Sequence, residues 1–141
     1  MLRTILYQST PQTSFPSEAD LKILESAWRH NAEMGVTGYL LRTRTRYFQV
    51  LEGSADVLDD LMELIDRDAR HDALEILLDT QVTHRKFSNW AMGYHLITED
   101  ERDEFQGWQD TGDVFARSMI DYMEDLARKR EAASPMHRAI T

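Results

Sequence analysis

The sequence predicts an α+β fold of the ferredoxin-like type, in which two helices cover one face of a mixed sheet and a helical cap follows. Three observations support this prediction. Five short segments are rich in β-favouring residues, two segments of helical periodicity separate them in the order β-α-β-β-α-β-β, and the last third of the chain becomes acidic. A chain of 141 residues can bury a core large enough to fold without disulfides or metals.

Periodicity and turn residues set the elements in order. Ser17 is suited to cap the first helix, and Gly35 is suited to end it. The connection over residues 43–46 lacks the Gly or Asn of a tight turn, so a longer loop is expected there. The predicted elements are a strand at 2–8, a helix at 18–34, strands at 36–42 and 47–51, a helix at 55–67, and strands at 74–83 and 90–97.

The remainder of the chain differs in composition. Residues 98–131 carry 11 acidic and 5 basic side chains, a net charge of −6 out of the total of −9. An apolar stripe runs through them, which predicts one or two amphipathic helices that suit self-association or the docking of a protein partner. Residues 132–141 are expected to form a flexible tail. The stripe consists of Phe115, Met119, Tyr122, Met123 and Leu126.

Composition argues against several classes of protein. A net charge of −9 opposes binding to nucleic acid or to anionic lipid, and no apolar run approaches the roughly 20 residues needed to span a membrane. The first residues are too short an apolar run for a signal peptide, so a cytoplasmic location is expected. There is no cysteine, and the five histidines show no close pairing, so no metal site is predicted.

Three polar residues fall within or beside apolar surfaces. Gln49 interrupts the run Tyr47-Phe48-Gln49-Val50-Leu51, and alternation along a strand places it on the same face as Tyr47 and Leu51. Burying this amide is costly unless its groups are bonded, so a solvent-facing Gln is an equal alternative. Tyr7 lies in the first strand. Asn31 lies near the end of the first helix, where it can equally bond local backbone groups.

Two further clusters are ambiguous when taken alone. The segment Asp68-Ala69-Arg70-His71 is expected to close the second helix, where basic side chains complement the helix dipole. Trp90 and Met92 share one face of the last predicted strand and are ordinary core residues by type. A functional reading of either cluster needs further support.

That support comes from their arrangement, because together these positions resemble the BLUF family of flavin photoreceptors over residues 1–97. Each matching segment is weak alone, but five in the same order at the same separations are specific. Gln49 within F-Q-V-L-E-G is the most specific of them. The segments are Tyr7-Gln8-Ser9, Asn31 with Gly35-Val36-Thr37-Gly38, Phe48 to Gly53, Asp68-Ala69-Arg70-His71, and Phe87 with Trp90-Ala91-Met92.

The resemblance implies a flavin, FAD or FMN, held non-covalently between the two helices. Tyr7 would donate an electron and a proton to the excited flavin, and Gln49 would lie between Tyr7 and the N5/C4-carbonyl edge of the ring. Asn31 would bond the polar edge of the flavin. Trp90 and Met92 would form a switch pair beside Gln49. The other residues implied near the ring or its side chain are His30, Asp68, Arg70 and His71.

The resemblance thus implies a blue-light sensor, with no enzymatic activity, that signals through an unidentified protein partner or a change of assembly as a homo-oligomer. Two alternatives stay open. A flavin-free interaction protein could use the same fold. An enzyme, either a flavin oxidoreductase or an acylphosphatase-like hydrolase, is less supported because no nicotinamide site or substrate-pocket motif is present.

Overall fold

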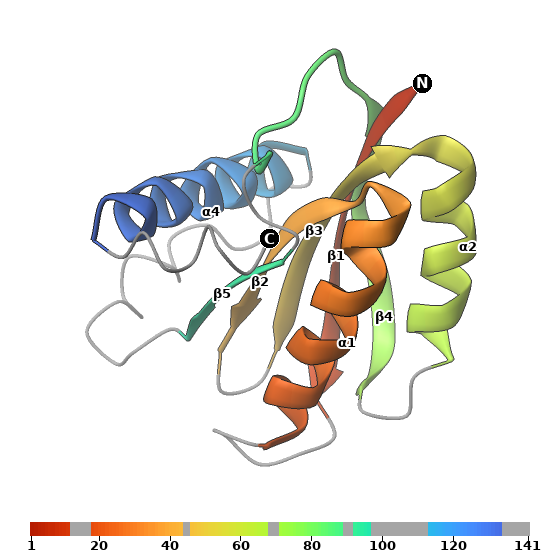
Figure 1. The fold of residues 1–141 in the computed structure, drawn as a ribbon, viewed down its shortest axis with the longest axis horizontal. Coiled ribbons are helices and arrows are strands. Elements are labelled where there is room, and N and C mark those ends of the chain that lie inside the picture. The colour runs from red at the N-terminus through yellow and green to blue at the C-terminus, as the bar shows by residue number, and fades with distance from the viewer. Residues whose placement is uncertain (12–17, 44–45, 68–70, 89–91, 97–112, 134–141) are drawn as a thin grey trace.

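A computed structural model describes residues 1–11, 18–43, 46–67, 71–88, 92–96 and 113–133 of the chain (Figure 1). The predicted order of elements is confirmed, and a single mixed sheet of five strands has the order β4-β1-β3-β2-β5. Only β2 and β5 run parallel; the other neighbouring pairs are antiparallel. The elements are β1 (Leu2–Pro11), α1 (Glu18–Met34), β2 (Thr37–Arg42), β3 (Tyr47–Ser54), α2 (Ala55–Asp66), β4 (His71–Gln81), β5 (Gly93–Leu96) and α4 (Asp113–Ala133).

Two apolar cores lie on opposite faces of this sheet, because successive strand residues point to opposite sides. On one face, α1 and α2 pack over Ile5, Tyr7 and Leu51. On the other face, α4 packs over Leu6, Phe48 and other strand residues. Figure 1 shows α1 and α2 together in front of the sheet and α4 away from them. The prediction of two helices on one face is therefore confirmed.

The C-terminal helix buries the apolar stripe that the sequence predicted. Met119 and Met123 are fully buried against the sheet, and Leu126 is nearly so. The stripe therefore does not form an exposed docking surface, because the second face of the sheet needs a cover of its own. The helix ends at Ala133, two residues beyond the predicted limit. Residues 97–112 and 134–141, which include most of the predicted tail, lie outside the described residues.

Two glycines are required by the backbone around β2. Gly35 follows α1 with a φ of 69°, so it adopts the left-handed conformation that commonly ends a helix, as predicted. Gly38 lies directly beside β3, and a Cβ at this position would collide with the carbonyl oxygen of Val50. The absence of a side chain thus allows β2 to approach the strand that carries Gln49.

Several predicted boundaries were wrong. β1 continues to Pro11, where it pairs with His71, so His71 opens β4 instead of closing the second helix. Between β2 and β3, the backbone N–H of Thr43 bonds the carbonyl of Arg46 at 2.9 Å, and residues 44–45 of the expected loop lie outside the described residues. β5 begins at Gly93 and leaves Met92 in a bend before it. Among the described residues, no helix is long and apolar enough to cross a membrane.

Candidate functional site

A cavity of about 510 Å³ lies between α1, α2 and the sheet. Its floor comes from the strand face that carries Tyr7, Leu40 and Gln49, which are all buried. Its upper part is open to solvent, because Met34 on α1 and Leu64 on α2 line it and are exposed. The remaining lining residues are Ser26, Ala27, His30, Asn31, Tyr47, Leu51, Leu61, Ile65 and Arg67.

Strand register brings Tyr7 and Gln49 together on this floor. The two residues are direct partners in the antiparallel pairing of β1 with β3, so their side chains leave the sheet on the same face. The hydroxyl of Tyr7 donates a hydrogen bond to Oε1 of Gln49. Both side chains are at least 95% buried. The sequence alternative of a solvent-facing Gln49 is thus wrong.

The amide of Gln49 also reaches Met92. Its Nε2 lies 3.3 Å from Sδ of Met92, and the Met92 side chain is 1% exposed. Met92 is held from the other side by α1, because the indole Nε1 of Trp28 donates to its carbonyl oxygen at 2.7 Å. No local sequence pattern indicated this long-range bond.

Two neighbouring residues of α1 have different environments. Asn31, which lies about one turn after Trp28, is 2% exposed and lines the cavity. His30 lines the exposed part of the cavity. Its Nδ1 lies 2.8 Å from the carbonyl oxygen of Ser26, one turn earlier on the helix. Asn31 is thus an inner wall residue and His30 a residue of the entrance.

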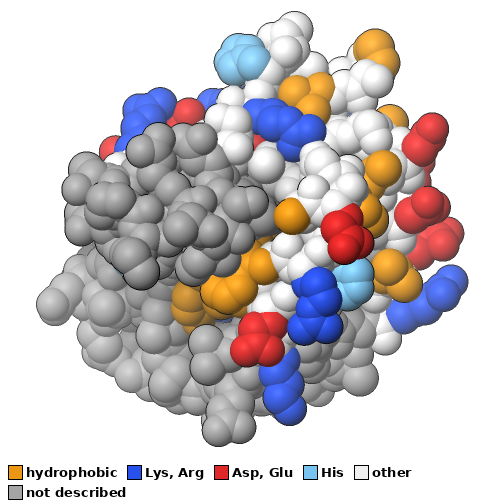
Figure 2. Space-filling view, in the orientation of Figure 1, with side chains coloured by type: hydrophobic (Ala, Val, Ile, Leu, Met, Phe, Trp, Pro, Cys, Tyr) orange, Lys and Arg blue, Asp and Glu red, His pale blue; other side chains and the backbone are white. Residues whose placement is uncertain are grey.

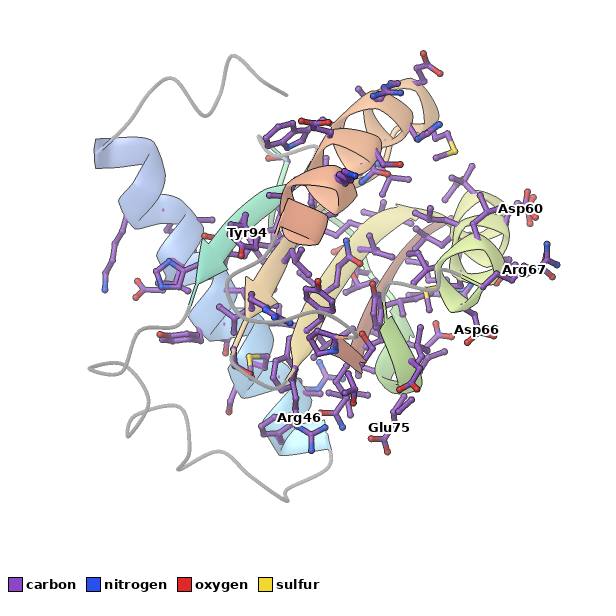
Figure 3. All side chains as sticks on the ribbon, turned by 90° about the horizontal axis from the view of Figure 1, so that it is seen from below. Arg46, Asp60, Asp66, Arg67, Glu75 and Tyr94 are labelled. Atoms are coloured by element: carbon purple, nitrogen blue, oxygen red, sulfur yellow. The ribbon has the colours of Figure 1, made fainter. Side chains whose placement is uncertain are left out.

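The second helix provides an apolar wall and a charged outer surface. Leu61 and Ile65 face the cavity, whereas acidic side chains gather over the outer side of α2 in Figure 2. Arg67, which caps the helix, also lines the cavity, and sequence reasoning did not single it out. Its guanidinium points away from the sheet in Figure 3 and lies 3.9 Å from Glu63. None of the described lining residues is an Asp or a Glu.

Four other predicted site residues cannot be placed at the cavity. Asp68, Arg70 and Trp90 lie outside the described residues. His71 is the first residue of β4, and its side chain is not described. The structure therefore brings together Tyr7, His30, Asn31 and Gln49 at the cavity and places Met92 against Gln49.

Comparisons with known proteins agree with this arrangement. The family model described as sensors of blue-light using FAD (BLUF) matches residues 2–93. The photoactivated adenylate cyclase subunit beta of Euglena gracilis is 33% identical over 95 residues, which cover 64% of this chain and 11% of that protein. The blue light- and temperature-regulated antirepressor BluF of Escherichia coli (strain K12) is 30% identical over 104 residues, which cover 74% of this chain and 26% of that protein.

The fold is also similar to that of a solved structure titled BlsA photo-activated state. The TM-score is 0.76 at 23% identity, and the match covers 88% of this chain and 95% of that chain. At 23% identity, this similarity shows that the two chains share a fold and nothing more. The two curated relatives are much longer proteins. The matched region is about a tenth of the Euglena protein and about a quarter of the Escherichia coli protein.

Proposed function

Because the chain belongs to the BLUF family of blue-light sensors that use a flavin, we propose that it senses blue light through FAD held non-covalently in the cavity between α1 and α2. Its lit state absorbs slightly to the red of the dark state and reverts in the dark. The observation that carries this proposal is the buried chain of contacts from Tyr7 through Gln49 to Met92 at the cavity floor.

The cavity fits a flavin in size and chemistry. Its volume of about 510 Å³ lies within the ~300–1,000 Å³ typical of small-molecule sites. Leu40, Leu61 and Ile65 offer apolar contacts for a planar ring system. Asn31 and Gln49 carry amides, which can both donate to and accept from the polar edge of the ring. The lack of carboxylates among the described lining residues also suits a ligand with phosphate groups.

A bound flavin supplies the absorption of blue light and a ring that accepts an electron. Tyr7 can release its hydroxyl proton along its hydrogen bond to Oε1 of Gln49. Gln49 can then reverse or tautomerise its amide and return to a different pattern of hydrogen bonds. No lasting covalent change is needed, so the system relaxes thermally. The roles implied for Asp68, Arg70, His71 and Trp90 stay predictions.

We propose that output passes through contact with another protein or a change of assembly. The matched region is 11% of the Euglena relative, so the cyclase activity in that protein's name is not carried over to this chain. In this chain, no motif for catalysis accompanies the cavity in the sequence. On this proposal, the signal leaves as a change of shape at the protein surface.

The test is an absorption spectrum of the purified protein, loaded with FAD, before blue light, after blue light and during dark recovery. The proposal predicts a bound flavin spectrum that shifts slightly to the red and returns. Lasting bleaching under light would indicate redox turnover instead. A protein that binds neither FAD nor FMN would refute the proposal and favour a flavin-free interaction module.

A further inference from the structure

A short segment between β4 and Met92, residues 85–87, is bound to a buried carboxylate of β3. We refer to residues 85–87 as the strap. Glu52 is 1% exposed, and its carboxylate accepts the backbone N–H of Lys86 at 2.6 Å and that of Phe87 at 3.0 Å. The hydroxyl of Thr37 donates to the same carboxylate at 2.9 Å. Such bonds are what allow a buried carboxylate to be tolerated.

The first residue of the strap attaches it to the C-terminal end of α1. The guanidinium of Arg85 bonds the carbonyl oxygen of Gly35 at 2.7 Å, that of Glu52 at 3.0 Å and the hydroxyl of Thr37 at 2.8 Å. Gly35 is the residue that ends α1. The strap is thus bound to β2, β3 and the end of α1 at once, which leaves it little freedom to move independently.

The other side of the strap contacts α4. Phe87 is 1% exposed and stacks on Tyr39 with ring centroids 5.8 Å apart, inside the core that α4 covers. The Lys86 ammonium lies 3.2 Å from a carboxylate oxygen of Asp121 and 3.7 Å from one of Glu124. These ion pairs connect α4 to a backbone segment that Glu52 holds.

The same segment leads to the proposed switch. Met92 follows Phe87 by five residues and contacts the amide of Gln49, which precedes Glu52 by three residues on β3. Alternation along β3 directs Gln49 to the cavity face and Glu52 to the α4 face. β3 therefore contacts both parts of this segment, Met92 through Gln49 and the strap through Glu52.

We propose that Glu52 is a positioning residue that sets how Met92 meets Gln49, and that Lys86 passes the state of this contact to α4. This inference rests on the proposed photosensory function and adds a route from the cavity to the opposite face of the sheet. The route runs through hydrogen bonds and ion pairs of the strap, so α4 responds to light without any ligand contact of its own.

The test replaces Lys86 with Met, which removes the ammonium and leaves the backbone N–H bonded to Glu52. The measurement is hydrogen exchange of α4 amides in the dark and under blue light, beside the absorption spectrum. Lys86→Met should retain the red shift and its dark recovery but lose the light-induced change in exchange over residues 115–129. The matched control is Lys129→Met, which removes an exposed lysine paired with Asp125 at 3.1 Å on the same helix and should keep that change.

A second variant, Glu52→Gln, tests the positioning role because it keeps the side-chain volume and removes the charge that holds the strap. It should shorten dark recovery several-fold, since a loosened Met92 lowers the barrier between the two arrangements of Gln49. Two results overturn this inference and leave the proposed function standing. In the first, Lys86→Met keeps the full light-induced change in exchange over α4. In the second, the wild-type protein shows the red shift but no change in α4 exchange under light. A wild-type protein without a red shift overturns the proposed function as well.

Discussion

At the scale of single residues, the amide of Gln49 has unequal neighbours. Its oxygen accepts from the Tyr7 hydroxyl, and its nitrogen donates toward the Met92 sulfur. If the amide reversed, its oxygen would face a thioether, which has no proton to donate. The observed orientation is thus the one in which both amide groups have partners.

Asn31 provides a residue-scale prediction about flavin affinity. Asn31→Ala should weaken FAD binding, because polar atoms of the ligand would be left unpaired in a buried place, at a cost of about 1–3 kcal/mol. That corresponds to roughly a 5- to 150-fold rise in Kd. Fluorescence titration of the flavin-free protein measures it. The control is Gln81→Ala, which truncates an exposed amide on β4 and should bind FAD like the wild type. An unchanged Kd in Asn31→Ala would contradict the assignment of Asn31 to the flavin site.

At the scale of elements, alternation along β3 was predictable and strand pairing was not. The sequence placed Gln49 on one face with Tyr47 and Leu51, and the structure confirms this. The direct pairing of Tyr7 with Gln49 depends on the order of strands in the sheet, which local patterns do not contain. Likewise His71 pairs with Pro11, whereas the local charge pattern alone favoured a helix end.

An ion-pair cluster at the edge of the sheet connects β1, β4 and α2. Arg3 forms two bonds of 2.7 Å to the carboxylate of Asp79 and lies 2.5 Å from Asp59 on α2. The hydrogen bond from Arg3 holds the pKa of Asp79 below its ordinary value of 3.8, against a smaller opposing effect of burial. The same two carboxylates raise the pKa of Arg3, which stays charged throughout.

This lowered pKa gives a prediction about stability and pH. Because the folded-state pKa of Asp79 is depressed, its contribution is present above the unfolded value near 3.8 and is lost as pH falls through the folded value. The effect should be modest, since the Asp79 side chain is 39% exposed. Thermal unfolding should show Asp79→Asn less stable than the wild type at pH 6, with the difference shrinking below pH 4. A difference that grows on acidification would contradict the sign.

At the scale of the whole molecule, the sheet separates two tasks. One face carries the cavity with Tyr7, Gln49 and Asn31, and the other is covered by α4. The sequence predicted the helical cap and, among the residues that line the cavity, Tyr7, His30, Asn31 and Gln49. The link from the cavity face to α4 through Glu52 and Lys86 was not predictable from the sequence. Lys86 contacts Glu52, 34 residues before it, and Asp121, 35 residues after it, and the second contact depends on how α4 docks on the sheet.

The most direct test of the central claim, that the Gln49 amide carries the light signal, is the light-minus-dark absorption spectrum of flavin-loaded Gln49→Leu beside the wild type. Leu is close to Gln in size but removes both the acceptor for Tyr7 and the donor to Met92. We predict that Gln49→Leu binds flavin and shows no reversible red shift, whereas the wild type shows one. A normal, reversible red shift in Gln49→Leu would contradict the account.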